Sequence, residues 1–181
     1  MKKPILLIAL LFMSTLAFGQ IQKGDVRLGG SLSLSKSDFN NGSDAKSFAI
    51  SPQASLFLSE TTSLGLALGY SSREINGQDS NLFTYGAFAR FYRNMGEKFY
   101  LYLQPGITLG TGDSNGTDLS TFGFSVTPGI AYFLSDKIAL DMNVGGFFYN
   151  SQDLGGVDTN NYAFNLNLTS FTMGASIFLR K

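Results

Sequence analysis

The stretch SLGLALGYS, residues 63–71, decides the fold, because its large apolar side chains fall on every second position. In an extended chain, Leu64, Leu66 and Leu68 would share one face with Tyr70, and the other face would carry only serine, glycine and alanine. A period of two residues is that of a β-strand, whereas an amphipathic helix repeats every three or four. The stretch therefore predicts a strand with one apolar face and one small, polar face.

The same alternation recurs along the chain and predicts eight strands. Their apolar residues continue one face throughout, except in the last segment, where the parity changes and a β-bulge is expected near Thr169 and Ser170. Pro52, Pro105 and Pro128 fall inside three of the segments, and local bulges are expected there too, because proline cannot donate to a strand ladder. The predicted segments are residues 26–35, 48–58, 63–71, 83–92, 99–110, 122–134, 138–148 and 166–179.

The connections between these segments alternate in expected length. Short turns are predicted at residues 59–62, 93–98 and 135–137, and longer polar loops at 37–46, 73–81, 111–119 and 150–161. All four long loops would then leave one end of the sheet, and both chain termini would lie at the other. Short turns on one side and long loops on the other are typical of outer-membrane barrels.

The polar face separates a membrane barrel from a soluble one. A soluble barrel would expose that face to water, with charges on about a quarter to a third of its surface. Here the face is mostly Gly, Ser, Ala, Thr and Asn, and only 14% of the chain is charged. A small, sheltered face fits a lumen, so we predict an all-β, eight-stranded antiparallel up-and-down transmembrane β-barrel with a lipid-facing apolar exterior and a polar lumen.

Aromatic residues add detail to this prediction. Alternation places one group inside the lumen and expects it to fill one sector: Phe57, Phe88, Tyr92, Tyr100, Tyr102, Phe133 and Phe147. The other groups would form girdles at the two membrane interfaces. These are Phe48, Tyr70, Phe83, Tyr85, Phe122 and Phe148 near the loops, and Phe91, Phe99 and Tyr132 near the turns.

Three charged residues lie well inside the predicted strands, and alternation places all of them on the lumen side. They are Arg27, Arg90 and Asp141. An isolated ion is costly in a narrow lumen, and one carboxylate between two guanidinium groups would pair both. One hypothesis is an ionic cluster that plugs the barrel near the turns. The alternative is that each group is separately hydrated near that mouth.

The first residues have the pattern of a secretory signal. Lys2 and Lys3 precede an apolar run, and Ala17 and Gly19 provide small residues before Gln20. We expect a signal peptide at residues 1–19 and the barrel domain at 20–181. The alternative, an uncleaved anchor helix, is disfavoured because the apolar run is shorter than the ~20 residues that span a bilayer.

Two stretches of the chain repeat each other without a gap. PQASLFLSETTSLGLALGY begins at Pro52, PGIAYFLSDKIALDMNVGG begins at Pro128, and each reads as strand, turn, strand. Each stretch has a proline followed by Phe-Leu-Ser and then Glu or Asp. In this pattern the chain resembles the outer-membrane β-barrel domain family common in Bacteroidetes, which is related in architecture to OmpA/OmpX-type and OmpW-type barrels. The resemblance implies location in the outer membrane, outer-membrane lipids and the barrel-assembly machinery as partners, and Phe178 as the assembly signal.

Several functions are excluded or disfavoured by composition. The chain has no cysteine and no histidine, so thiol chemistry and a histidine base are unavailable, and a membrane-embedded lipid-modifying enzyme is the least favoured function. Thirteen basic residues balance thirteen acidic ones, which leaves no basic patch for nucleic acid. GDSNGTD at 112–118 could hold calcium, but it lacks the spacing of a calcium loop and is interpreted as a turn. No metal or cofactor is expected.

Two function classes remain. One is a structural or surface-interaction protein that displays four extracellular loops to a ligand that the sequence does not identify. The other is a narrow channel for water, ions or small solutes, since the interior of eight strands is just wide enough for side chains to fill.

Overall fold

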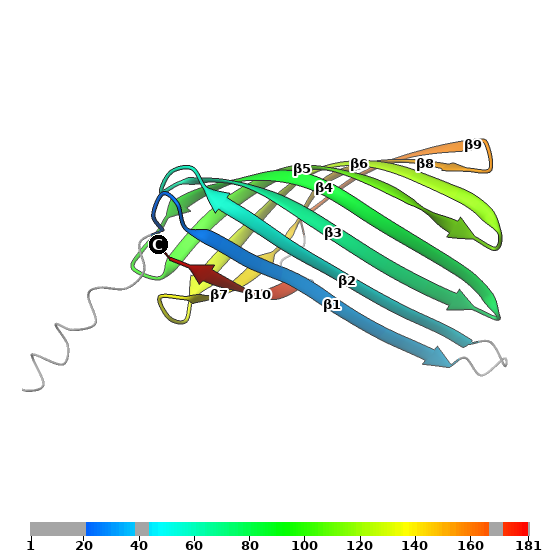
Figure 1. The fold of residues 1–181 in the computed structure, drawn as a ribbon, viewed down its shortest axis with the longest axis horizontal. Helices are drawn as coiled ribbons and strands as arrows, with labels where there is room; N and C mark the ends of the chain where they lie inside the picture. Colours follow the sequence, from blue (N-terminus) through cyan, green and yellow to red (C-terminus); the bar gives the residue numbers. More distant parts are fainter. Residues whose placement is uncertain (1–20, 39–43, 167–171, 181) are drawn as a thin grey trace, which may run out of the picture.

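A computed structural model describes residues 21–38, 44–166 and 172–180 of the chain. It is a closed antiparallel barrel of eight strands, as predicted (Figure 1). Two of the eight are each divided into two parts, β7 and β8 at Val144, and β9 and β10 on either side of residues 167–171, which lie outside the described residues. The elements are β1 (Val26–Asp38), β2 (Asp44–Phe57), β3 (Thr62–Ile75), β4 (Gln78–Asn94), β5 (Phe99–Ser114), β6 (Thr117–Phe133), β7 (Ile138–Asn143), β8 (Gly145–Leu154), β9 (Val157–Leu166) and β10 (Thr172–Leu179).

Each strand pairs with its neighbour in the chain, and β1 pairs with β10 to close the ring. The closing ladder runs from Val26 opposite Leu179 to Gly30 opposite Ala175. This ladder closes the ring toward the turns, where it pairs backbone groups that an open sheet edge would leave unpaired in hydrocarbon. Among the described residues, β1 beyond Gly30 pairs only with β2, and β9 pairs only with β8, so these two edges are not paired with each other. In the described residues, no helix is long and apolar enough to cross a membrane.

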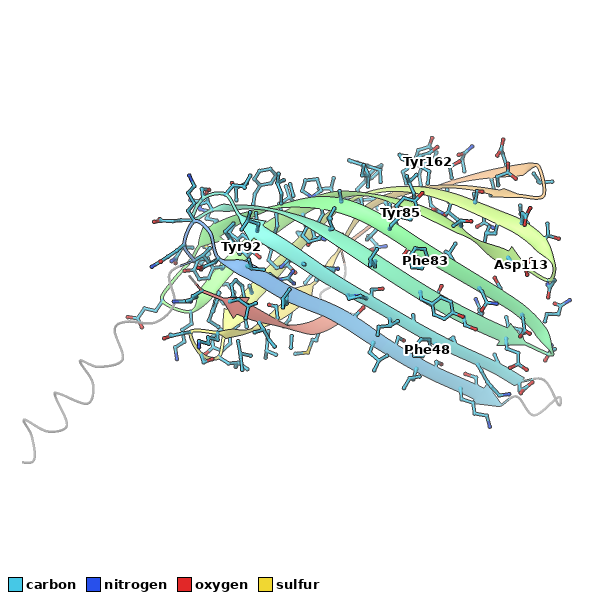
Figure 2. The ribbon with its side chains drawn as sticks, in the orientation of Figure 1. Phe48, Phe83, Tyr85, Tyr92, Asp113 and Tyr162 are labelled. Atoms are coloured by element: carbon cyan, nitrogen blue, oxygen red, sulfur yellow. The ribbon has the colours of Figure 1, made fainter. Side chains whose placement is uncertain are left out.

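The two faces of the barrel differ as the alternation predicted. Leu66 is 68% exposed on the outside, whereas Phe88, on the other face of the sheet, is 7% exposed. Figure 2 shows Phe48, Phe83 and Tyr85 on the exterior and Tyr92 inside one end of the barrel. A continuous apolar exterior of this kind is unsuited to water and suited to lipid.

The connections at the end away from the chain termini, here called the hairpin end, are shorter than predicted. Three of them are two-residue turns, at Asn76-Gly77, Asn115-Gly116 and Gly155-Gly156, and all six residues have positive φ. Positive φ at both positions is the geometry of a type I′ hairpin turn. The expectation of long loops at 73–81, 111–119 and 150–161 was therefore wrong: these polar segments continue the strands. Residues 39–43, at the centre of the fourth predicted loop, lie outside the described residues.

The opposite end, here called the turn end, carries the four-residue connections and both described chain ends. The repeated Phe-Leu-Ser sequence forms the same turn twice. The Leu58 N–H donates to the Thr62 carbonyl at 2.9 Å, and the Leu134 N–H donates to the Ile138 carbonyl at 2.9 Å. The internal repeat of the sequence is thus also a repeat of structure.

The three strand prolines disturb the ladder less than predicted. Around Pro52, Ile50 still faces Tyr70 and Gln53 still faces Ala67, so no extra residue is inserted. The register is likewise kept across Pro105. Proline removes one donor, but its fixed φ is compatible with a strand. Only opposite Pro128 is there a bulge, at Val144, whose N–H reaches the Pro128 carbonyl at 3.5 Å.

The bulge at Val144 reverses the parity of the strand that follows. Phe147, predicted to lie in the lumen, is 37% exposed and its ring lies 6.3 Å from that of the outward-facing Phe124. Phe148, predicted to join the outer girdle, consequently occupies a position that alternation assigns to the lumen face. The parity change predicted for the last strand is confirmed. Phe164 pairs with the outward-facing Phe147 and shares its parity with Leu166, whereas in β10 the exposed Ile177 has the opposite parity. The proposed position of its bulge, at Thr169 and Ser170, lies outside the described residues, as does the expected signal peptide at 1–19.

Candidate functional site

The lumen is filled at the turn end by a cluster of five aromatic side chains, here called the aromatic floor. Their rings contact one another in a closed cycle with centroid distances of 4.8 to 6.5 Å. Each is almost fully buried. The floor consists, in contact order, of Phe57, Tyr92, Tyr100, Phe133 and Phe178.

Backbone hydrogen bonds fix several members of the floor to the neighbouring segment of chain. The Phe57 N–H donates to the Asp25 carbonyl at 2.9 Å, the Tyr92 N–H to the Thr61 carbonyl at 2.7 Å, and the Phe178 N–H to the Lys137 carbonyl at 2.7 Å. Because the donors come from β2, β4 and β10, the floor is attached on several sides of the barrel. The aromatic residues therefore close the lumen across its width.

The sequence predicted most members of the aromatic floor but not their arrangement in the lumen. Phe57, Tyr92, Tyr100 and Phe133 lie in the lumen as predicted, yet they form a layer across it and do not occupy one sector. Phe178, considered above only as an assembly signal, completes the cycle. Its parity relative to Ile177 and Leu179, both exposed, could have identified it as inward-facing.

Arg27, Arg90 and Asp141, the three residues predicted to form an ionic cluster, come together in the lumen. Arg27 Nη2 donates to Asp141 Oδ2 at 2.5 Å, and Arg90 Nη1 donates to Asp141 Oδ1 at 3.0 Å. Their side chains are only 3%, 3% and 7% exposed. One carboxylate thus bridges two guanidinium groups out of contact with bulk water, and this set is here called the lumen triad.

Arg90 has further partners that sequence reasoning missed. Its Nε and Nη2 donate to Gln104 Oε1 at 2.8 and 2.6 Å, and its Nη1 donates to the Tyr92 hydroxyl at 3.2 Å. The guanidinium carbon lies 4.0 Å from the centroid of the Tyr102 ring, a cation–π distance. Gln104 and the tyrosines share the inward parity of their strands, and that parity was the only signal for them. Arg90 is therefore held by β4, β5 and β7 together.

Two glycines leave space for the side chains of Arg27 and Tyr102. A Cβ built at Gly29 would lie 2.9 Å from Nη2 of Arg27, and a Cβ at Gly129 would collide with the Tyr102 ring across the strand pair. The Tyr102 hydroxyl in turn donates to Asn143 Oδ1 at 2.7 Å. The lumen triad and its neighbours thus require glycine at position 29, on the same strand as Arg27, and at position 129, on the strand paired with that of Tyr102.

Arg27, in contrast to Arg90, is incompletely paired. Its Nε and Nη1 are buried and have no hydrogen-bond partner, and the same holds for the hydroxyls of Ser55, Ser63 and Ser176. A polar hollow of about 100 Å³ adjoins the lumen triad. It is lined by Arg27, Gly30, Ser31, Gln53, Arg90, Gln104, Asp141, Asn143, Met173, Gly174 and Ala175.

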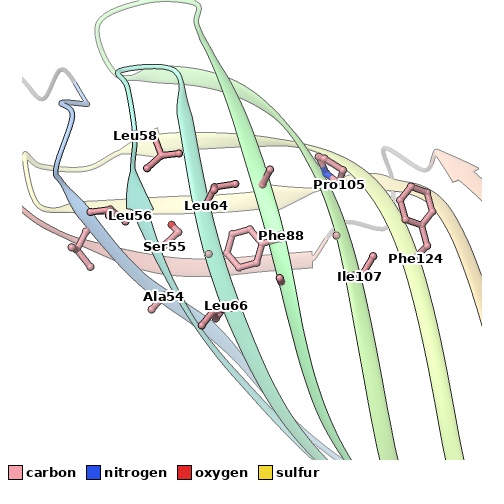
Figure 3. Close-up of a pocket in the computed structure, with 15 residues that line it drawn as sticks. Ala54, Ser55, Leu56, Leu58, Leu64, Leu66, Phe88, Pro105, Ile107 and Phe124 are labelled. Atoms are coloured by element: carbon pink, nitrogen blue, oxygen red, sulfur yellow. The ribbon is translucent and has the colours of Figure 1, made fainter.

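A larger hollow, of about 840 Å³, has a different character (Figure 3). Most of its lining side chains belong to the outward-facing set, such as Leu56, Leu64 and Leu66. Apart from Ser55, the described residues that line it are apolar or glycine. It offers hydrocarbon surface and no group for catalysis or metal binding.

The segment considered for calcium binding forms a hairpin turn. Asp113 Oδ1 accepts the Gly116 N–H at 2.9 Å, so this carboxylate caps the turn. In the described residues, no group of three or more acidic, cysteine or histidine side chains is placed to hold a metal ion.

An antiparallel barrel with an apolar exterior, a polar interior and an aromatic floor defines the class of transmembrane β-barrels. Comparison of the sequence with protein families agrees: the profile of the outer membrane protein beta-barrel domain matches residues 5–170, and the chain belongs to this family.

A solved structure shows the same fold. The chain is similar to Neisserial surface protein A, with 18% identity, a TM-score of 0.50, and coverage of 86% of this chain and 94% of that one. It also matches the Yersinia pestis outer membrane protein Ail, with 11% identity, a TM-score of 0.46, and coverage of 87% and 100%. A de novo designed transmembrane β-barrel matches at 14% identity and a TM-score of 0.37, with coverage of 87% and 98%. No curated protein matched the sequence.

Proposed function

We propose that this outer-membrane barrel is closed to solutes and serves a structural or surface-interaction role, holding its hairpins at the cell surface. The observation that carries the proposal is the double obstruction of the lumen at the turn end. The aromatic floor spans the barrel, and the lumen triad lies beside it through the contact of Arg90 with Tyr92. Both layers are buried and internally bonded, which leaves little free space for solutes.

The hairpin end is suited to presenting polar residues to a partner at the cell surface. The strands of the β3–β4, β5–β6 and β8–β9 hairpins continue to two-residue turns, and their tips are rich in exposed polar residues. Paired strands lose little further conformational entropy on binding, so they present a preorganised surface. We place this end outside the cell and the turn end in the periplasm, as in barrels of this class.

The proposal includes export of the chain and its insertion into the outer membrane. A cleaved signal peptide at residues 1–19 would direct the chain through the inner membrane, and the barrel-assembly machinery would insert it among outer-membrane lipids. The proposed role involves no catalysis, and the ligand of the hairpins is not identified by the residues that form them.

Planar-bilayer conductance of the purified, folded protein tests the closed lumen. We expect the wild-type protein to give no steady current and the Phe57→Ala/Phe178→Ala/Arg27→Ala variant to conduct, because it removes two adjacent members of the aromatic floor and one side chain of the lumen triad. Phe83→Ala removes an equally large ring from the lipid face and should stay silent. A steady current through the wild-type protein would overturn the proposal in favour of a narrow channel.

A further inference from the structure

The hollow beside the lumen triad carries an excess of positive charge. Two guanidinium groups, of Arg27 and Arg90, and one carboxylate, of Asp141, are the charged groups that line it. Asp25, the other buried acidic residue, immediately precedes β1 and does not line the hollow, and its Oδ2 accepts the Gln22 N–H at 3.0 Å. The hollow therefore has one positive charge that no lining residue balances.

That unbalanced charge belongs to Arg27. Asp141 divides its two oxygens between the arginines, but Arg90 also has Gln104 and Tyr92, whereas Arg27 has only its contact with Asp141. Two nitrogens of Arg27, Nε and Nη1, are buried without a partner. A buried donor without an acceptor destabilises the fold, and more so where the group is charged. The guanidinium thus has donors available for an acceptor that carries negative charge.

The size of the hollow limits what that acceptor can be. Its volume is about 100 Å³, and one water occupies about 30 Å³ of liquid. One small anion with a water or two would fill it, whereas a sugar or a lipid headgroup would extend beyond it. The amide side chains of Gln53, Gln104 and Asn143 add neutral polar groups to the lining.

We propose that this hollow is a binding site for one small monovalent anion, of the size of chloride or formate. Gln53 is central to it, because it lies opposite Gly29 in the strand pair, and the Arg27 guanidinium passes over Gly29. The bound anion accepts from Arg27, and the site then balances two guanidinium groups with two negative charges. The inference concerns occupancy of the lumen and does not depend on whether the barrel conducts.

Chloride-35 NMR of the folded, detergent-solubilised protein tests the proposal. Exchange of chloride with a protein site broadens its resonance, and we expect broadening above that of protein-free micelles, removed by formate but not by gluconate, which is too large for the hollow. Gln53→Glu places a carboxylate beside Arg27 and should abolish the broadening. Ser71→Glu adds the same charge elsewhere on the lumen parity, outside the lining of the hollow, and should retain it.

Three results would overturn the proposal: wild-type broadening no greater than that of micelles, equal broadening in both variants, or broadening that formate fails to displace. The formate competition uses wild-type protein alone, so it decides the matter even if Gln53→Glu does not fold. Chloride binding by a barrel that also conducts would refute the closed lumen and leave the anion site standing.

Discussion

Removing the carboxylate of the lumen triad is the most informative single substitution. Asp141→Asn keeps the shape of the side chain but leaves two buried guanidinium groups without their shared negative partner. The two hydrogen bonds, at 2.5 and 3.0 Å, are of the charge-assisted kind that contributes about 1.5–3 kcal/mol each. Removing one partner of a buried pair costs about 3–5 kcal/mol. We therefore expect the free energy of unfolding to fall by about 3–5 kcal/mol.

Urea unfolding of the barrel in detergent, followed by the loss of β-sheet circular dichroism, measures this effect. With a slope of about 2 kcal/mol per molar urea, the midpoint should fall by about 1.5 to 2.5 M. Glu97→Gln is the control, because it removes a carboxylate from an exposed position in the connection between β4 and β5 and should leave the midpoint unchanged.

A second substitution tests whether the loss comes from an unpaired charge. Arg27→Met combined with Asp141→Asn removes the guanidinium that has no other partner, while Arg90 keeps Gln104 and Tyr92. The double variant should therefore be more stable than Asp141→Asn alone, as expected for directly coupled residues. A midpoint for Asp141→Asn within about 0.3 M of wild type, or strictly additive effects in the double variant, would refute the reasoning.

Three further predictions follow from other parts of the barrel. Phe178→Ala should lower the free energy of unfolding by about 3–5 kcal/mol, because the ring is 0% exposed in the aromatic floor, and Phe91→Ala on the lipid face should cost clearly less in the same urea titration. Gly116→Ala should cost about 1 kcal/mol, because φ at this position is 78° and the added Cβ meets nothing, so the loss measures backbone strain alone. Gly96→Ala, which also meets nothing and has no positive φ, should be neutral; equal losses in the two alanine variants would contradict the assignment. Intact-mass measurement of protein extracted from outer membranes should find a chain that begins at Gln20, and a chain that retains residues 1–19 would disprove cleavage there.

Much of this fold could be predicted from the sequence because burial in a barrel imposes a strict two-residue period. The period identified Leu64, Leu66 and Leu68 as outward-facing and placed Arg27, Arg90 and Asp141 on the lumen parity without any knowledge of contacts. Assigning side chains to a face by odd and even position gives the wrong face beyond a point where one residue is inserted. The bulge at Val144 is followed by Gly145-Gly146, and Gly145 has a φ of 102°. Glycine inside a strand is a bulge signal, but the alternation was continued through this pair, which put Phe147 on the wrong face.

Turn lengths were mispredicted for a different reason. Polar composition was interpreted as loop, but a strand that projects beyond the apolar band of a membrane meets water on both faces and has no need of apolar residues. Asn76-Gly77 and Asn115-Gly116 were the available signals, since Asn-Gly favours two-residue hairpin turns. The pairing of Gln104 with Arg90 could not be predicted at all, because it depends on the register between β4 and β5 and on the rotamers of both side chains.

The orientation of the two faces of the barrel can be tested directly by tryptophan fluorescence, since the chain contains no tryptophan. In vesicles of brominated phospholipid, bromine on the acyl chains quenches tryptophan that contacts lipid. We predict strong quenching for Leu66→Trp, on the exposed face, and little quenching for Phe88→Trp, in the lumen. Equal quenching at the two positions, or stronger quenching at position 88, would contradict a barrel with lipid outside and a filled, polar lumen within.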